Sequence, residues 1–286
     1  MSFLSHIEIA NNAKLDKYLP YYWRDQPIGF IRRDRLELIK SLPAAFEIEK
    51  DRINLPASLD SYHARSAALS DAIERIADKG IITGWRGEKY PITSKFGATS
   101  LAEVERAAAS FLGIRSWGVH INGYVYKADG IHMWVATRAK DKPTYPGMLD
   151  NMVAGGQPLG LSLHENVIKE CAEEASIPES LAASAKPVSA IGYFHEWEPG
   201  LKPDQMFCYD LELPESFKPE AADGEVESFE LIPIKEIYNL VRDTTKFKYN
   251  CNLCIIDFMI RHAILNPDNE PDYMDICMGL KRTHAL

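Results

Sequence analysis

The spacing of hydrophobic residues changes along this chain. Up to about residue 115 the apolar positions recur at helical spacing, which predicts helices over 15–23, 30–42 and 58–80. The segment 81–98 alternates aromatic and turn residues, which indicates a short hairpin. We therefore expect residues 1–115 to form a smaller, mostly helical N-terminal domain.

From residue 116 the hydrophobic period shortens toward two. The segments 117–127 and 131–139 alternate apolar and polar residues on either side of Asp129-Gly130, a dipeptide typical of tight hairpin turns. A sheet is therefore expected to begin here. Together with the helical pattern that follows, this predicts an α/β domain over 116–286.

A helix over 163–175 is predicted, because Ser162 and Glu165 have the spacing of a capping box. Its inward face carries apolar residues at every fourth position: Leu163, Val167, Cys171 and Ala175. Its other flank carries three carboxylates at positions i, i+3 and i+4: Glu170, Glu173 and Glu174. Such spacing places the three carboxylates on one side of the helix.

Three close carboxylates repel one another, so they need either solvent or a cation. One interpretation is a solvated helix face, on which Lys169 pairs with Glu165 and Glu173. The other is a metal site, and the preceding Gly155-Gly156 favours it. Glycine lets a backbone carbonyl and a phosphate approach the carboxylates closely, and Mg²⁺ prefers such oxygen ligands and bridges to substrate phosphates.

The formal net charge of −9 argues against a nucleic-acid partner, because phosphate backbones are held by clustered basic residues. A small anionic substrate would need metal ions or a few local cations. Five basic residues are candidates: Arg86, Lys89, Arg138, Lys140 and Lys142.

Neither a membrane span nor a secretory signal is indicated by the hydrophobic pattern, so we expect a cytoplasmic protein. Five cysteines, an odd number on a long chain, fit reduced thiols better than a disulfide framework. Cys251 and Cys254 have apolar neighbours at helical spacing. Buried helix positions are favoured for them over a zinc or redox site.

The glycine bend and the acidic helix together resemble the signature of the Nudix hydrolase family, G-x5-E-x7-R-E-U-x-E-E-x-G-U, in which U is a bulky apolar residue. The residues that match in register are Gly155, Glu170, Cys171, Glu173, Glu174 and Ile177. Three positions depart from the signature: Leu161, Lys169 and Ser176. The resemblance implies an α/β/α sandwich with a mixed sheet.

The same resemblance implies a Mg²⁺ or Mn²⁺ site made by the helix acids and a backbone carbonyl: Gly155, Glu170, Glu173 and Glu174. Family members often use a further acid from a later turn, here within 223–237. Glu225 and Glu227 are the candidates for this role, although each could instead be a solvated turn acid. The predicted catalytic residues are therefore Glu170, Glu225 and Glu227.

A wider resemblance covers nearly the whole chain. The segments 21–34, 84–92 and 257–262 look like Nudix proteins related to the N-terminal part of fungal thiamine pyrophosphokinase. Leu161 and Lys169 look usual for this subgroup. The resemblance implies hydrolysis of thiamine diphosphate, or of its damaged oxy and oxo analogues, to the monophosphate.

Substrate contacts are predicted for Arg138, Lys142 and His195. An apolar slot could be built from several aromatic residues: Trp117, Tyr124, Trp134, Tyr193, Phe194 and Trp197. The histidines at 120, 164 and 195 do not have the spacing of metal ligands. The expected partner is a small-molecule diphosphate, and a homodimer is compatible with the sequence.

Two alternatives stay open. An enzyme resembling isopentenyl-diphosphate isomerase would share the order of strands, loop and acidic helix, but it would need a cysteine and a histidine-rich metal site near the pocket. A non-catalytic, diphosphate-binding regulatory module would explain Leu161 and Lys169.

Overall fold

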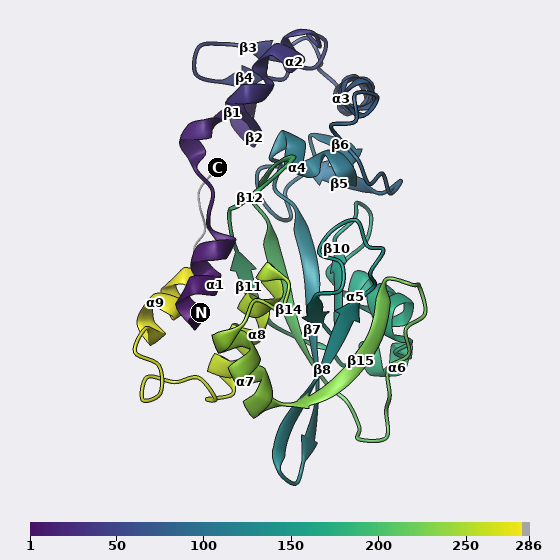
Figure 1. Cartoon of the computed structure of the whole chain (residues 1–286). Helices are drawn as coiled ribbons and strands as arrows, with labels where there is room; N and C mark the ends of the chain where they lie inside the picture. Colours follow the sequence, from purple (N-terminus) through teal and green to yellow (C-terminus); the bar gives the residue numbers. More distant parts are fainter. Residues whose placement is uncertain (282–286) are drawn as a thin grey trace.

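A seven-stranded mixed sheet forms the centre of the larger part of the molecule (Figure 1). The computed structural model describes residues 1–281. The strand order is β11-β14-β7-β8-β15, with β10 beside β7 and β9 beside β8. The strands are β7 (Trp117–Lys127), β8 (Gly130–Arg138), β9 (Leu149–Asn151), β10 (Val153–Gly156), β11 (Lys186–Gly192), β14 (Gln205–Glu212) and β15 (Val226–Pro233). Strands β14 and β7 are parallel, whereas β7 and β8 form the predicted antiparallel hairpin.

Helices cover both faces of this sheet (Figure 1). One face carries α5 (Leu163–Ala175) and α6 (Glu179–Ala182), and the other carries α1 (Phe3–Ala10), α7 (Ile234–Asp243), α8 (Tyr249–Arg261) and α9 (Tyr273–Leu280). Strand β14 shows the alternation, because Cys208 packs with α8 while Tyr209 packs with α5. The predicted α/β/α sandwich is confirmed.

The N-terminal region has its own apolar core, built from helices and two small sheets. Its strands are β1 (Tyr18–Trp23), β2 (Gln26–Arg32), β3 (Glu47–Ile48), β4 (Ile53–Asn54), β5 (Lys89–Ile92) and β6 (Ala102–Glu105). Its helices are α2 (Leu36–Lys40), α3 (Tyr62–Ala77) and α4 (Ala109–Leu112), with short 3₁₀ turns η1 (Leu15–Lys17), η2 (Arg33–Arg35) and η3 (Arg106–Ala108). The region was predicted to be mostly helical with a short hairpin, and it contains the helices together with a four-stranded sheet that was not expected.

Two helix predictions in this region were wrong over part of their length, because 15–23 includes strand β1 and 30–42 begins within strand β2. Residues 18–23 form strand β1, which pairs with β2 and β4 instead of continuing a helix. Pro20 disfavours a helix interior, and the surrounding aromatic residues suit a half-buried strand. The expected hairpin in 81–98 contributes only β5, whose partner β6 lies later in the chain. The predicted helix over 58–80 is confirmed as α3.

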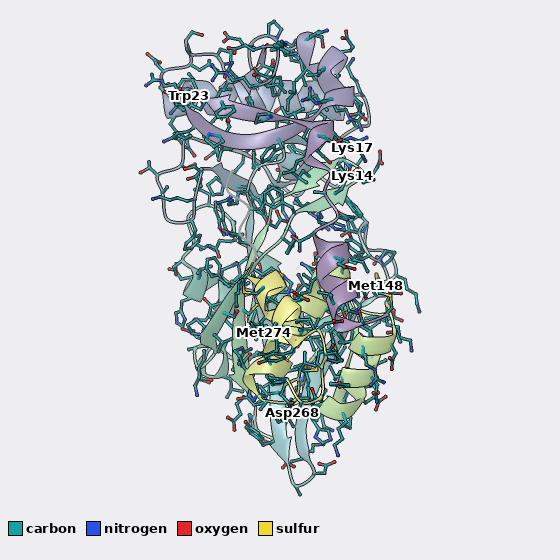
Figure 2. The ribbon with its side chains drawn as sticks, turned by 90° about the vertical axis from the view of Figure 1, so that its left-hand side faces the viewer. Lys14, Lys17, Trp23, Met148, Asp268 and Met274 are labelled. Atoms are coloured by element: carbon teal, nitrogen blue, oxygen red, sulfur yellow. The ribbon has the colours of Figure 1, made fainter. Side chains whose placement is uncertain are left out.

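The N-terminal region lies over one end of the seven-stranded sheet (Figure 1). Figure 2 shows the same arrangement from the side, with Trp23 in the upper part and Asp268 in the lower part. Helix α1 belongs spatially to the lower part, because it packs against α8 and α9. The remaining segments are a small ribbon, β12 (His195–Trp197) and β13 (Gly200–Lys202), which contacts α4.

Helix α8 lies almost entirely inside the protein. Cys251 and Cys254 are both buried free thiols on this helix, which confirms that the pair occupies buried helix positions. Among the helices within residues 1–281, none is both long enough and apolar enough to cross a bilayer.

Candidate functional site

Helix α5 holds the acidic residues against the sheet. Its capping box is present: the Glu165 N–H donates to Ser162 Oγ at 3.2 Å, and the Ser162 N–H donates to Glu165 Oε2 at 2.8 Å. The apolar side of the helix packs on β10 and β7. The capping box fixes the residue at which α5 begins, and the apolar packing fixes which face of α5 lies on the sheet. As a result, the side chains of Glu170 and Glu174 lie toward β10.

Glu174 is the centre of an acidic group. Its Oε2 accepts a hydrogen bond from the Ala154 N–H at 2.9 Å. One carboxylate oxygen from each of Glu174, Asp223 and Glu225 lies within 4.8 Å of the others. Burial, followed by the charges of neighbouring acids, raises the pKa of Glu174 well above its ordinary value. A bound cation would offset both effects.

Glu170 lies directly against Gly155 of β10. A β carbon on Gly155 would be only 2.1 Å from Glu170 Cδ, so any larger residue would displace the carboxylate. Burial also raises the pKa of Glu170. The predicted close approach of the glycine bend and the helix acid is therefore present, while the role of the Gly155 carbonyl as a metal ligand stays a prediction.

Two of the predicted acids, Glu173 and Glu227, lie outside the group of acids around Glu174. Glu173 is half-exposed and pairs with Lys169 at 2.8 Å, which is the solvated-face arrangement that we considered from the sequence. Glu227 is also half-exposed and pairs with Lys140 at 2.9 Å. Their predicted metal and catalytic roles stay predictions that this placement does not support.

Asp223 is an acid that sequence reasoning missed. It lies in the turn before β15, where its Oδ1 accepts a hydrogen bond from the Glu225 N–H at 2.8 Å. The sequence feature that could have identified Asp223 is its position at the start of the acidic segment 223–237. From that segment, only glutamates were considered as catalytic or metal-binding acids. We use the name acidic group below for Glu170, Glu174, Asp223 and Glu225.

Glu225 connects the acidic group to two cations. It forms ion pairs with Lys142 and with Arg86, whose Nη1 lies 3.6 Å from Glu225 Oε1. Burial alone would raise the pKa of Glu225, but Lys142 and Arg86 outweigh it and lower the pKa. Glu225 is therefore held ionised at the boundary between acidic and basic side chains.

A cleft of about 720 Å³ runs between the N-terminal region and the sheet, and it reaches the acidic group at Glu225. Glu225 and the backbone of 154–156 form part of its wall. Its basic lining includes Arg86, Arg106, Arg138, Lys142, Lys202 and Lys248. Its aromatic lining includes Tyr90, Trp117, Tyr145, Tyr193, Trp197 and Tyr249. This composition suits a ligand with an anionic end and a planar apolar end.

The N-terminal region closes the cleft over the glycine bend. A β carbon on Gly156 would lie 1.7 Å from the Tyr90 hydroxyl oxygen and 3.6 Å from Arg106 Cζ. Arg106 also pairs with Glu88 through a 2.7 Å contact. Burial raises the pKa of Tyr90 to about 12, so its hydroxyl stays protonated at neutral pH.

The three predicted substrate-binding residues lie in different environments. Lys142 and Arg138 line the cleft, whereas His195 packs behind it, stacked on Tyr249 at 3.9 Å. The Arg138 guanidinium donates to Asp150 and to the carbonyls of Thr144 and Tyr145, at 2.8 to 3.0 Å. Arg138 thus braces the loop beside the cleft, and its predicted substrate contact stays a prediction.

Half of the aromatic candidates reach the cleft. Trp117, Tyr193 and Trp197 line it, whereas Tyr124 and Phe194 are buried in apolar clusters. Trp134 packs against the cluster under α5. Sequence reasoning missed three aromatic wall residues, which come from distant segments: Tyr90, Tyr145 and Tyr249.

The donors of the acidic group are all oxygen atoms. Hard divalent cations such as Mg²⁺ and Mn²⁺ prefer carboxylate oxygens, whereas sulfur and imidazole ligands favour softer metals. The buried carboxylate of Glu174, surrounded by other acids, fits such a cation. The acidic group can therefore hold a hard divalent cation at the end of the basic cleft.

Known proteins resemble this chain over both of its parts. Residues 2–116 match a family described as a domain of unknown function, DUF4743. The chain is 40% identical over 290 residues to Nudix hydrolase 20, chloroplastic, of Arabidopsis thaliana, covering 98% of this chain and 77% of that protein. It is 38% identical over 283 residues to Nudix hydrolase 24, chloroplastic, of the same plant, with the same coverage.

Similarity to solved structures is more distant. A MutT/nudix family protein from Enterococcus faecalis superimposes with a TM-score of 0.43 and 14% identity, covering 57% of this chain and 67% of that protein. The Nudix domain of Shewanella oneidensis NrtR gives a TM-score of 0.42 and 13% identity, over 52% of this chain and 88% of that domain. The family assignment accordingly rests on the two plant relatives.

This chain belongs to the Nudix hydrolase family. The predicted enzyme class, a Nudix-type diphosphate hydrolase, is confirmed, and the isomerase alternative loses its support. The two plant relatives are named as chloroplast proteins, so the cytoplasmic location stays a prediction for this chain.

Proposed function

We propose that this protein hydrolyses a small organic diphosphate to a monophosphate and inorganic phosphate, with Mg²⁺ or Mn²⁺ as cofactor. Thiamine diphosphate or one of its oxy or oxo analogues is the proposed substrate. The observation that carries the proposal is the acidic group, centred on the buried Glu174, beside a basic, aromatic cleft.

The acidic group would hold the cations through Glu174, Asp223 and Glu225, whose carboxylate oxygens lie within 4.8 Å of one another, together with Glu170. When bound, Mg²⁺ or Mn²⁺ withdraws charge from the phosphate oxygens and favours the attack of water on phosphorus. Glu174 is held in place by the Ala154 N–H and Glu170 by its contact with Gly155. Both side chains therefore have one orientation before the substrate arrives.

The basic side chains of the cleft orient the diphosphate. Lys142 and Arg86 pair with Glu225, and Arg106 lies beside the glycine bend, so three cations surround the position next to the acidic group. Arginine binds phosphate oxygens through a planar fork of donors. This arrangement supports a binding mode in which the scissile bond lies between the basic wall and the acidic group.

Glu170 and Glu225 are the two candidates for accepting the proton of the attacking water. Glu225 is engaged by two cations, Lys142 and Arg86, whereas Glu170 has a single ion-pair partner among the described residues, Lys169 at 3.2 Å. We propose Glu170 as the general base. If so, the acidic limb of the pH profile of kcat should shift in Glu170→Gln. The same limb should be retained in Glu225→Gln.

An aromatic wall supports a planar heterocycle as the organic part of the substrate. Tyr145 and Trp197 have ring centroids 5.2 Å apart, and Tyr145 lies 5.5 Å from Tyr249. All three line the cleft, whose volume is within the range of small-molecule sites. A ring of the size found in thiamine can stack on this wall while its diphosphate reaches the acidic group.

A substrate panel tests the proposal. Phosphate release is measured with Mg²⁺ or Mn²⁺ from thiamine diphosphate, oxythiamine diphosphate, ADP-ribose and nucleoside diphosphates, using wild type and Glu174→Gln. We expect the thiamine-type diphosphates to be the best substrates and the variant to be inactive but folded. Faster turnover of ADP-ribose would overturn the substrate assignment. Binding of every diphosphate without phosphate release would favour the regulatory module.

A further inference from the structure

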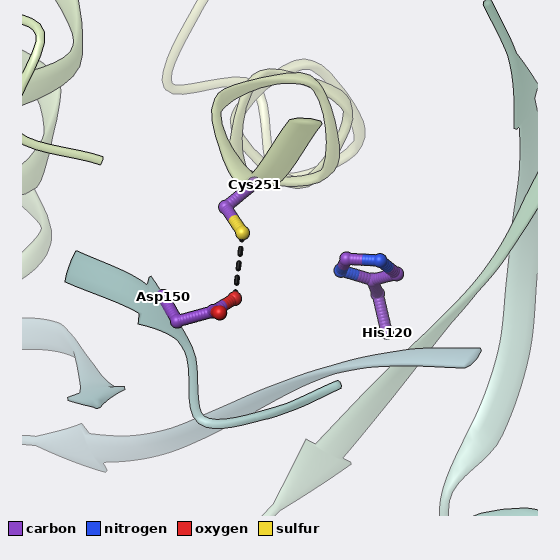
Figure 3. A group of neighbouring side chains, drawn as sticks. All are labelled: His120, Asp150 and Cys251. Carbon is purple, nitrogen blue, oxygen red and sulfur yellow. Dashed lines mark hydrogen bonds between the residues drawn. The ribbon is translucent and has the colours of Figure 1, made fainter. Parts of the chain in front are cut away.

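His120 of β7 lines the cleft, although it is only 5% exposed. Figure 3 shows its ring beside the hydrogen bond that Cys251 Sγ donates to Asp150 Oδ1 at 2.6 Å. Because this bond uses the proton of the thiol, the hydrogen-bond partners of the His120 ring lie elsewhere. A buried polar atom that lacks a good partner needs an explanation, and one of the two ring nitrogens is such an atom.

A chain of hydrogen bonds sets the tautomer of His120. Asp210, which is paired with Arg261 and can only accept, receives the Asn122 amide N–H at 3.2 Å. Asn122 Oδ1 then accepts from the Asn151 amide at 3.1 Å, which turns Asn151 Oδ1 toward His120 Nδ1, 2.9 Å away. Nδ1 therefore donates its proton, and Nε2 carries a free lone pair.

The orientation of the Asn250 amide follows from this tautomer. Burial lowers the pKa of His120 to about 4, so the ring is neutral at neutral pH and Nε2 stays an acceptor. Its hydrogen-bond neighbour among the described residues is the Asn250 amide, at 3.5 Å, which is long for a hydrogen bond. Because Nε2 accepts, the end of the amide that faces it must be the NH₂ group.

A second chain of contacts gives Asn250 the same orientation. Asn250 Nδ2 donates to the Tyr193 hydroxyl oxygen at 3.2 Å, and Tyr193 in turn donates toward Asp204. Burial raises the pKa of Asp204 to about 6, against the hydrogen bond from Tyr193, so this carboxylate is ionised at neutral pH and can only accept. The two chains therefore meet with a donor beside an acceptor. We use the name donor–acceptor pair for Asn250 Nδ2 and His120 Nε2.

The donor–acceptor pair lies between the acidic group and the aromatic wall. His120 is the direct partner of Ala154 in the pairing of β7 with β10, and the Ala154 N–H binds Glu174. Residues directly opposite each other in such a pair have Cα atoms about 4.5–5.5 Å apart. On the other side, Tyr249 precedes Asn250 in α8, and both residues line the cleft. A ring stacked on Tyr249 can therefore present its edge to the pair.

We propose that the donor–acceptor pair binds the edge of a nitrogen heterocycle in which an N–H group lies beside a ring nitrogen or a carbonyl oxygen. His120 Nε2 accepts the N–H of the ligand, and Asn250 Nδ2 donates to the neighbouring nitrogen or oxygen. The two new bonds replace the long contact between the side chains. An aminopyrimidine has such an edge, and so does the lactam of an oxypyrimidine. The inference rests on the proposed function, because it concerns the organic part of the diphosphate substrate.

Calorimetric binding to the full chain in EDTA tests the pair without metal or hydrolysis. The probes are thiamine monophosphate and the analogue in which hydrogen replaces the amino group of its pyrimidine. Wild type should bind thiamine monophosphate about 5- to 100-fold more tightly, because the analogue leaves a buried acceptor unpaired. His120→Phe should bind the two probes with equal affinity. His132→Phe, the same change at a buried histidine that does not line the cleft, should keep the wild-type ratio.

Circular dichroism establishes that each variant is folded, and Asn250→Asp, which keeps the side-chain shape, replaces His120→Phe if the latter is not. Asn250→Asp sets an acceptor against an acceptor of the ligand, so it should weaken binding of thiamine monophosphate at least about fivefold. Equal wild-type affinity for the two probes, or no binding of either, would overturn the proposal. The same holds for a wild-type ratio in folded His120→Phe or unchanged affinity in Asn250→Asp. Phosphate release with Mg²⁺ depends on the acidic group, so failure of the pair leaves the proposed hydrolysis intact, and the reverse also holds.

Discussion

Gly155 and Glu170 are packed so closely that one additional carbon atom would not fit between them. A β carbon on Gly155 would lie 2.1 Å from Glu170 Cδ and 2.4 Å from its Oε1. The glycine of the bend therefore acts on the acidic helix directly, by leaving space for a carboxylate against the backbone of β10.

Gly155→Ala should displace Glu170 and reduce kcat by about 100-fold, the scale of losing one electrostatic group in an active site. Overpacking should also cost about 1–3 kcal/mol of unfolding free energy. Steady-state kinetics and thermal melting measure the two effects. In Gly155→Ala combined with Glu170→Ala the stability should return while activity stays low, because the clash is gone. Equal instability of the single and double variants would contradict the contact.

Glu173 provides a matched control on the same helix. It is half-exposed and pairs only with Lys169 among the contacts of the described residues, so Glu173→Gln should change stability by less than about 0.5 kcal/mol. Its kcat and its affinity for Mn²⁺ should remain close to wild type. A loss of activity comparable to that of Glu170→Gln would show that Glu173 binds the metal after all.

The acidic group makes stability depend on pH and on cations together. Glu170 and Glu174 have pKa values raised above 4.5 in the folded state, so the folded protein binds more protons than the unfolded chain above that pH. Without divalent cations, stability should therefore fall as pH rises from 4.5 through the raised values. Mg²⁺ should reverse this fall, with a larger increase in melting temperature at pH 8 than at pH 5.

Thermal melting across this pH range, with Mg²⁺ or with EDTA, measures the effect. In Glu174→Gln the melting temperature should fall less with rising pH, and Mg²⁺ should raise the melting temperature less than in wild type. A wild-type protein whose melting temperature in EDTA does not fall with pH in this window would contradict the burial argument.

Arg106 tests the contribution of the N-terminal region to the site. It lies 3.6 Å from the β-carbon position of Gly156 and has Tyr90 beneath it. Removing one charge-assisted hydrogen bond of about 1.5–3 kcal/mol should raise KM for the diphosphate about 10- to 100-fold in Arg106→Ala. Arg106→Lys keeps the positive charge but not the planar pair of hydrogen-bond donors. Its KM should therefore lie between the values of wild type and Arg106→Ala. An unchanged KM in Arg106→Ala would mean that the N-terminal region closes the cleft without binding substrate.

The part of the site that the sequence predicts is the part with local causes. Helix α5 follows from its capping box and its four-residue apolar repeat, and both are interactions within one segment. The hairpin of β7 and β8 follows from alternation on either side of Asp129-Gly130. These features need no knowledge of the rest of the chain.

The remaining features depend on tertiary contacts between distant segments. Strand β1 has a pattern that also fits a helix, and only its pairing with β2 and β4 decides its structure. Arg106, Lys202 and Lys248 share one cleft although they lie far apart in the sequence. His195 stacks on Tyr249 and is not among the residues that line the cleft, so its substrate contact stays a prediction.

The most direct test of the account is Mn²⁺ binding, measured by electron paramagnetic resonance titration of wild type and Glu174→Gln. We predict that wild type binds Mn²⁺ and that Mg²⁺ competes for the same site. The variant should bind at least about tenfold more weakly while its circular dichroism is unchanged. Equal Mn²⁺ affinity in the two proteins would contradict the claim that the acidic group is the cation site.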